Sequence, residues 1–236
     1  MASKPHDWAD VAGRQRASRG TLWSALLTRL TWVWKPLVYS SAYLAFIAVA
    51  EVLVVRYLLS LPPSPAPIVG ALITFAVYAN DRLVDLETDA ESSPKRTAFV
   101  RRHRDTLYVL AALAYGIAVA VSVLGGPVSL GLALLPGAAW VLYAVDWVPV
   151  SDAPFRRLKE IVVLNSALVA VAWSLPIVLL PLAFADAGLG ATAVVLFLYF
   201  ALATFVNTEI ANVGDVESDR QSGDATLPVV LGVERT

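Results

Sequence analysis

Long apolar segments dominate this chain and constrain its fold more than any other feature. Of its 236 residues, 58% are hydrophobic, and the mean hydropathy is +0.66, well above what a soluble domain shows. A helix needs about 20 apolar residues to cross a bilayer, and six segments reach or approach that length. They are residues 37–60, 65–80, 106–125, 127–145, 160–185 and 188–210. The sequence therefore predicts an all-α integral membrane protein, built as a multi-helix transmembrane bundle.

The basic residues predict an orientation for these segments. Lys and Arg collect in cytoplasmic loops, and all 18 of them except Arg56 precede the first segment or lie in every second connection after it. We therefore expect a multi-pass protein of the cell membrane with its N-terminus in the cytoplasm. Residues 1–20 are predicted to be a polar tail, 21–36 an interfacial helix, and 37–236 the transmembrane domain.

Charge and cysteine content exclude several kinds of site. The formal net charge is −1, so no overall field attracts nucleic acid and we expect no nucleic-acid partner. The chain has no cysteine, which excludes disulfides, thiolate metal sites and cysteine nucleophiles. The two histidines, His6 and His103, lie far apart in the sequence and outside the apolar segments. These observations argue against a histidine metal site.

Two acidic clusters with one shared pattern follow apolar segments. Asp85-Leu-Glu-Thr-Asp89 follows the second segment, and Asp215-Val-Glu-Ser-Asp219 follows the sixth. The loop charges place both clusters on the cytoplasmic side. Carboxylates next to lipid are costly and point to function, and the repetition of the pattern makes a merely solvated helix end the weaker explanation.

Helical spacing predicts that each cluster presents one face. Asp81, Asp85 and Asp89 are four residues apart and share a face if the second segment continues as a helix. Asn212 shares a second face with Asp215 and Asp219 in the same way. Mg²⁺ prefers oxygen ligands and usually binds one or two carboxylates together with substrate phosphates. The clusters therefore predict a pair of cation sites facing one ligand.

Basic residues beside the clusters extend this prediction to a diphosphate. Arg96 follows the first cluster, and Lys159 opens the fifth apolar segment. Arg is suited to phosphate because its planar fork donates two parallel hydrogen bonds. Carboxylates, Mg²⁺ and basic residues together form a diphosphate site, although the rule that places positive charge in the cytoplasm explains Arg96 and Lys159 equally well.

The two clusters resemble the motifs of the UbiA superfamily of intramembrane prenyltransferases. The first motif here is Asp81-Arg-Leu-Val-Asp85-Leu-Glu-Thr-Asp89, followed by Pro94-Lys-Arg96, and the second runs from Asn212 through Asp219 to Thr226-Leu-Pro-Val229. Aligned on the later aspartates, Asp81 stands where the family has Asn, and Arg82 stands where it has Asp. The family usually has nine helices, about six of which are present, so the C-terminal helices are expected to be missing.

The resemblance implies Mg²⁺-dependent transfer of an isoprenyl group from a prenyl diphosphate donor to a lipophilic acceptor, within the membrane lipid. It implies that the later aspartates of both motifs are catalytic and hold Mg²⁺: Asp85, Asp89, Asp215 and Asp219. Asp81 is expected to be a further metal ligand. Arg96, Lys159 and Asn212 are expected to bind the substrate.

Other functions fit parts of the sequence. A divalent-cation transporter or a non-catalytic membrane protein could also carry acidic cation sites, but a transporter places them near the bilayer centre, where Glu51 is the sole acidic residue. A CDP-alcohol phosphotransferase would carry Asp-Gly and Ala-Arg pairs inside one motif, and neither cluster does. Mg²⁺-dependent binding of a prenyl diphosphate separates the enzyme from the transporter.

Overall fold

The computed structural model describes residues 34–86, 90, 93–144, 164–222 and 226–236, and within them it contains helices and no strand. The long helices, in chain order, are α2 (Ala42–Leu58), α3 (Ala66–Val84), α6 (Arg104–Ser122), α7 (Gly126–Ala144), α8 (Leu164–Phe184) and α9 (Ala191–Ser222). Each overlaps one of the six predicted apolar segments, in the same order. The predicted all-α membrane bundle is confirmed.

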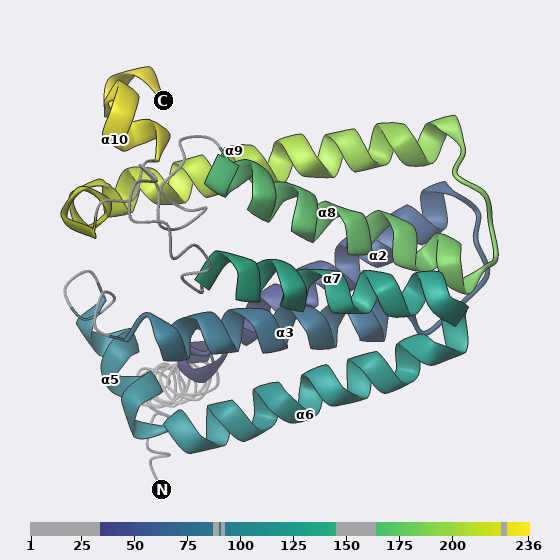
Figure 1. Cartoon of the computed structure of the whole chain (residues 1–236), viewed down its shortest axis with the longest axis horizontal. Helices are drawn as coiled ribbons and strands as arrows, with labels where there is room; N and C mark the ends of the chain where they lie inside the picture. The colour runs from purple at the N-terminus through teal and green to yellow at the C-terminus, as the bar shows by residue number, and fades with distance from the viewer. Residues whose placement is uncertain (1–33, 87–89, 91–92, 145–163, 223–225) are drawn as a thin grey trace, which may run out of the picture.

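Four of the described helical stretches are long and apolar enough to cross a membrane. They are Ala66–Val84, Arg104–Ala138, Ser166–Phe184 and Ala191–Glu217. The second comprises α6, the short turn η1 (Val123–Gly125) and much of α7, and Figure 1 shows that α7 folds back along α6. Helix α2 has 17 residues, which is at the lower limit for a span. The chain is therefore a multi-pass membrane protein.

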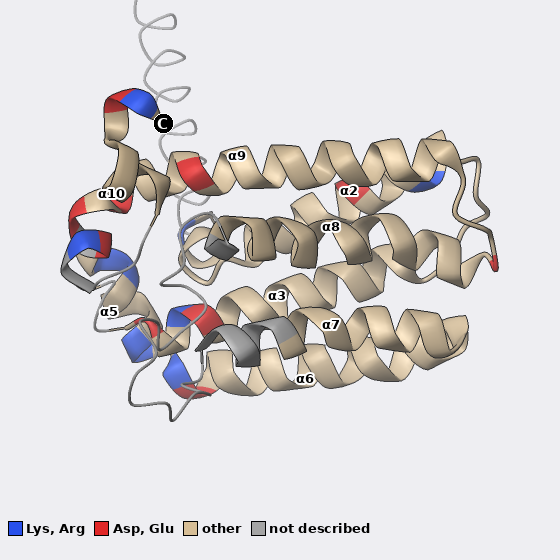
Figure 2. Ribbon diagram, turned by 45° about the horizontal axis from the view of Figure 1, so that its top comes forward, with Lys and Arg blue, Asp and Glu red and all other residues tan. Residues whose placement is uncertain are grey.

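Successive helices run in opposite directions, so alternate connections lie at the same end of the bundle (Figure 1). One end of the bundle, at the left of Figure 1, holds the C-terminal ends of α3, α7 and α9. The short helices α5 (Pro94–Arg102) and α10 (Leu227–Leu231) lie at the same end. Figure 2 shows that most charged residues of the described part collect at this end. Arg56, in the last turn of α2, and Asp186, between α8 and α9, are at the other. Both acidic motifs thus begin at the charged end.

The packing of the bundle is suited to lipid. Large apolar side chains point outward, and Leu113 on α6 and Leu202 on α9 are both more than half exposed. Inside, α3 packs along α6. Buried alanines recur every three or four positions on α6 (Ala111, Ala114 and Ala118) and face a helix that buries Ala76 and Ala79. Small side chains let two helices approach closely, which favours association in a membrane where lipid is as apolar as the core.

The helix boundaries agree with the predicted face at the second motif and correct it at the first. The sixth apolar segment ends at residue 210 and α9 continues to Ser222, so Asn212, Asp215 and Asp219 lie on one helix, as their spacing predicted. Conversely, α3 ends at Val84, and Asp85 is its C-cap with φ −87° and ψ 20°. The expected shared face therefore extends only from Asp81 to Asp85, one turn apart, and Asp89 lies outside the described residues. Helix α5 was not predicted. The predicted tail and nearly all of the predicted interfacial helix also lie outside the described residues.

The turn into α7 gives a test of the fold. Gly126 has φ +78° and ψ −173°, a backbone conformation that is essentially confined to glycine. A Cβ there would meet nothing within 4 Å, so Gly126→Ala adds only backbone strain, about 1–3 kcal/mol. Gly116, inside α6, has equally open surroundings with a helical backbone. We expect Gly126→Ala to lower the free energy of unfolding in mixed micelles and Gly116→Ala to leave it unchanged or raise it. Equal losses in both variants would contradict the positive-φ backbone at Gly126.

Candidate functional site

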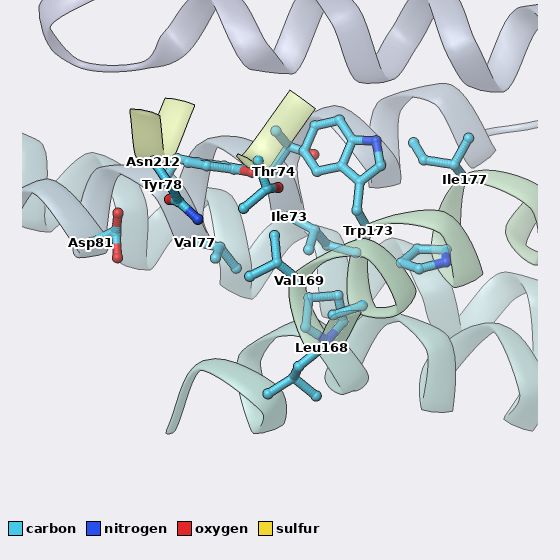
Figure 3. Close-up of a pocket in the computed structure, with 15 residues that line it drawn as sticks. Ile73, Thr74, Val77, Tyr78, Asp81, Leu168, Val169, Trp173, Ile177 and Asn212 are labelled. Atoms are coloured by element: carbon cyan, nitrogen blue, oxygen red, sulfur yellow. The ribbon is translucent and has the colours of Figure 1, made fainter. Parts of the chain in front are cut away.

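A cavity of about 240 Å³ lies among α3, α7, α8 and α9. Its lining is mainly apolar, and Figure 3 shows Ile177 and Trp173 toward one end, with Asp81, Tyr78 and Asn212 toward the other. Because Asp81 is in the last turn of α3, the polar end of the cavity faces the charged end of the bundle. The cavity can therefore receive a molecule with an apolar body and a charged head.

The cavity wall follows helical periodicity. The lining residues of α3 recur every three or four positions: Gly70, Ile73, Thr74, Val77, Tyr78 and Asp81. This spacing places them on one face of the helix. Asp85 continues that face by a further turn. On α9, Thr208 and Asn212 line the cavity, and Asp215 and Asp219 follow them at the next helical steps. Both acidic motifs therefore continue the cavity-lining faces beyond its polar end.

Two separate motifs thus contribute to one cavity. Asp81 opens the first motif on α3, Asn212 opens the second on α9, and both line the same space. The sequence predicted that the two clusters face one ligand, and one residue of each motif lines this cavity. Asp85 is partly buried and Asp215 is exposed, and neither lines the cavity.

The structure also shows what the neighbours of Asp81 do. Asn80 donates from Nδ2 to the carbonyl oxygen of Ala76 at 2.9 Å, one turn back in its own helix. Arg82 donates from Nε to Oγ of Ser41 at 3.2 Å, where Ser41 forms the left-handed turn before α2. Of these three residues, only Asp81 lines the cavity. Arg82 stands where the family has Asp, and its side chain joins α3 to the start of α2.

Asn212 is oriented by two neighbours that the sequence did not predict as site residues. Its Nδ2 donates to Oε2 of Glu209 at 3.4 Å and to Oγ of Ser166 at 3.5 Å. Glu209 is only 5% exposed, and its Oε1 has no hydrogen-bond partner within the part of the chain that the structure describes. A carboxylate accepts hydrogen bonds, so the Asn212 amide turns its NH₂ toward Glu209. The Asn212 Oδ1 is thereby left free of these two contacts.

Thr226 contacts the last aspartate of the second motif and was not predicted as a site residue. Its Oγ1 donates to Oδ2 of Asp219 at 3.1 Å, and the threonine is only 3% exposed. Thr226 is also the N-cap of α10, with Pro228 buried in the first turn. The short helix therefore packs back on α9 and brings a hydroxyl donor to Asp219. The available signal was the Thr-Leu-Pro-Val run that follows the motif.

Arg96 is not among the residues that line this cavity. It lines a second pocket with Val38, Tyr39 and Ser93. Lys159 and Asp89 lie outside the described residues. Among the residues that the structure does describe, no three His, Cys, Asp or Glu side chains are close enough to hold a metal ion by themselves.

Comparison with known proteins agrees with this arrangement. The UbiA prenyltransferase family model matches residues 65–236, which include both acidic motifs and most of the chain. No curated protein and no solved structure is significantly similar to the chain. The match covers well over half of the sequence, and the helical membrane bundle is the fold that the family predicts. The chain belongs to the UbiA prenyltransferase family, a family of membrane prenyltransferases.

Proposed function

We propose that the chain transfers an isoprenyl group from a prenyl diphosphate to a lipophilic acceptor within the membrane, with Mg²⁺. One observation carries the proposal: Asp81 and Asn212, from different motifs, line the polar end of a single, mainly apolar cavity. The apolar walls suit the isoprenyl chain, and the polar end suits the diphosphate. Apolar walls also exclude water, which would otherwise capture a reactive allylic centre.

The proposed donor set is suited to Mg²⁺. It would consist of oxygen ligands at the polar end of the cavity and just beyond it, with Asp81 and Asp85 on the α3 side and Asp215 and Asp219 on α9. Mg²⁺ is usually held by one or two carboxylates and completes its shell with water and substrate phosphates, so a preformed cage of three carboxylates is not required. When bound, Mg²⁺ would offset the charge that builds on the departing diphosphate.

The other predicted site residues take supporting roles in this proposal. Asn212 would direct its Oδ1 toward the polar end, because Glu209 and Ser166 occupy its NH₂. Asp89 would be a further Mg²⁺ ligand. Arg96 and Lys159 remain proposed phosphate ligands on the basis of their charge and their positions in the sequence.

Donor binding tests the proposed function directly. We expect the detergent-solubilised chain to bind geranylgeranyl diphosphate in the presence of Mg²⁺ and not to bind it in EDTA. Isothermal titration calorimetry measures both affinities. Asp81→Asn removes a charge that holds the cation, so we expect at least about a 10-fold loss of affinity, equivalent to about 1.4 kcal/mol.

Asp186→Asn is the matched control, because Asp186 lies at the opposite end of the bundle and its φ of +50° is tolerated by Asn. Affinity should not change in this variant. Binding that is insensitive to EDTA, or an equal loss in both variants, would contradict the metal role of Asp81. Mg²⁺ uptake into liposomes without donor binding would favour a cation transporter.

The absence of cysteine makes the orientation testable with single-cysteine variants. We propose that the N-terminus and the acidic motifs face the cytoplasm of the cell, since most basic residues of the described part lie at the end with the motifs. In intact cells, a membrane-impermeant maleimide should label Asp186→Cys, and it should label Glu217→Cys only after lysis. Both positions are exposed, so accessibility within the protein does not bias the result. The reverse labelling pattern would overturn the orientation.

The contact between Thr226 and Asp219 predicts a role for the hydroxyl group. Thr226→Val keeps the shape of the side chain but removes the donor, and a hydrogen bond to a charged group is worth about 1.5–3 kcal/mol. We expect the Mg²⁺ concentration for half-maximal donor binding to rise about 10-fold or more in this variant. Thr226→Ser keeps the hydroxyl and should behave as the unmodified chain. A similar rise in both variants would show that Thr226 acts only through packing.

A further inference from the structure

The proposed function leaves one ionisable side chain in the middle of a membrane helix unexplained. Glu51 lies near the centre of α2, and an ionisable residue at that depth is kept for a purpose. Its Oε2 accepts a hydrogen bond of 2.8 Å from Nε1 of Trp173 on α8. The carboxylate therefore joins two helices through the indole ring and fixes the position of that ring.

The ring that Glu51 holds is part of the cavity wall. Trp173 and Tyr78 both line the cavity and form an edge-to-face pair, with ring centroids 5.8 Å apart and planes at 76° (Figure 3). Tyr78 precedes Asp81 by three residues on the same face of α3, about 4.5 Å along the helix axis. Tyr78 thus lies just inside the polar end, next to the proposed diphosphate position, and Trp173 packs against it on the side toward Ile177 (Figure 3).

The proposed reaction creates positive charge at this depth. When the bond between the allylic carbon and the bridging oxygen breaks, the electron pair leaves with the diphosphate and the allylic group becomes a cation. The face of an aromatic ring attracts a cation, indole most strongly, and the attraction is larger where water is excluded. A hydrogen bond donated by the indole N–H to a carboxylate further increases the electron density of the ring.

We propose that Trp173, paired with Tyr78, stabilises the allylic cation, and that Glu51 is a positioning residue that holds the indole ring in place. The inference rests on the proposed function and adds to it a place where the positive charge is stabilised. It explains why a carboxyl group lies inside the membrane at a position where it accepts the hydrogen bond of Trp173.

Cleavage of the carbon–oxygen bond can be measured without knowing the acceptor. In geranylgeranyl diphosphate labelled with ¹⁸O at the bridging position, cleavage followed by return scrambles the label among the oxygens of the α-phosphate. The rate of scrambling in the full chain with Mg²⁺ reports formation of the cation, while calorimetry on the same preparation reports donor affinity. The two readouts separate stabilisation of the cation from binding of the donor.

Four variants give the expected pattern. Trp173→Leu should slow scrambling about 10- to 30-fold, corresponding to about 1.4–2 kcal/mol of lost cation stabilisation. Glu51→Leu should slow it by a smaller factor, and Glu51→Gln should restore it, because the amide oxygen still accepts the indole N–H. Tyr199→Leu is the matched control: Tyr199 forms an edge-to-face pair with Phe200 on α9 but does not line the cavity. Donor affinity should change less than about 3-fold in all four.

Any other pattern overturns the inference. If Trp173→Leu scrambles the label at the same rate as the Tyr199→Leu control, the indole does not stabilise the cation. A loss of donor affinity that matches the loss of rate would show that the ring binds the isoprenyl chain instead. If Trp173→Leu does not fold, the comparison of Glu51→Leu with Glu51→Gln decides, and equal rates in those two would exclude the positioning role.

The unmodified chain separates this inference from the proposed function. A chain that binds the donor without scrambling would overturn this inference alone. A chain that binds no donor would overturn the proposed function as well.

Discussion

The exclusion of charge from the hydrocarbon layer is the constraint on which the rest of this structure depends. Every backbone polar group inside the membrane must be satisfied within the protein, so the chain crosses as helices. Charged side chains are costly there, so they collect at the helix ends, as Figure 2 shows. Because successive helices are antiparallel, the ends of α3 and α9 lie at the same end of the bundle. Two motifs that are distant in the sequence thereby reach one cavity.

The cavity combines two environments that the proposed chemistry needs. Its polar end is formed by Asp81 and Asn212, and its walls are formed by apolar and aromatic side chains of α3 and α8. In the proposed function, a cation between the carboxylates and a diphosphate would be stabilised electrostatically, and the walls would displace nearby water. The contacts from Glu209 and Thr226 orient the groups of the second motif, and Glu51 orients Trp173. Two of these contacts, at Asn212 and at Trp173, act on residues that line the cavity.

Much of this arrangement could be predicted, because it is local. Hydropathy located all six long helices, and helical spacing showed that Asp81 and Asp85 lie one turn apart. Hydropathy stops being informative where a helix leaves the lipid. Helix α9 continues for 12 residues beyond the apolar segment that ends at 210, and there the helical spacing of Asn212, Asp215 and Asp219 was the informative signal. Arg96 lines a separate pocket with Val38 and Tyr39, and its contact with phosphate stays a proposal.

The sequence by itself determined that this is a helical membrane protein, where its spans lie and which carboxylates mark its two motifs. These properties depend on the side chains of short segments and on the cost of placing them in lipid. Only the tertiary structure decided that Asp81 and Asn212 share a cavity, that Thr226 contacts Asp219 and that Glu51 holds Trp173. Each of these joins different helices or folds the chain back on itself. Such contacts depend on how the helices pack, which no local pattern of residues specifies.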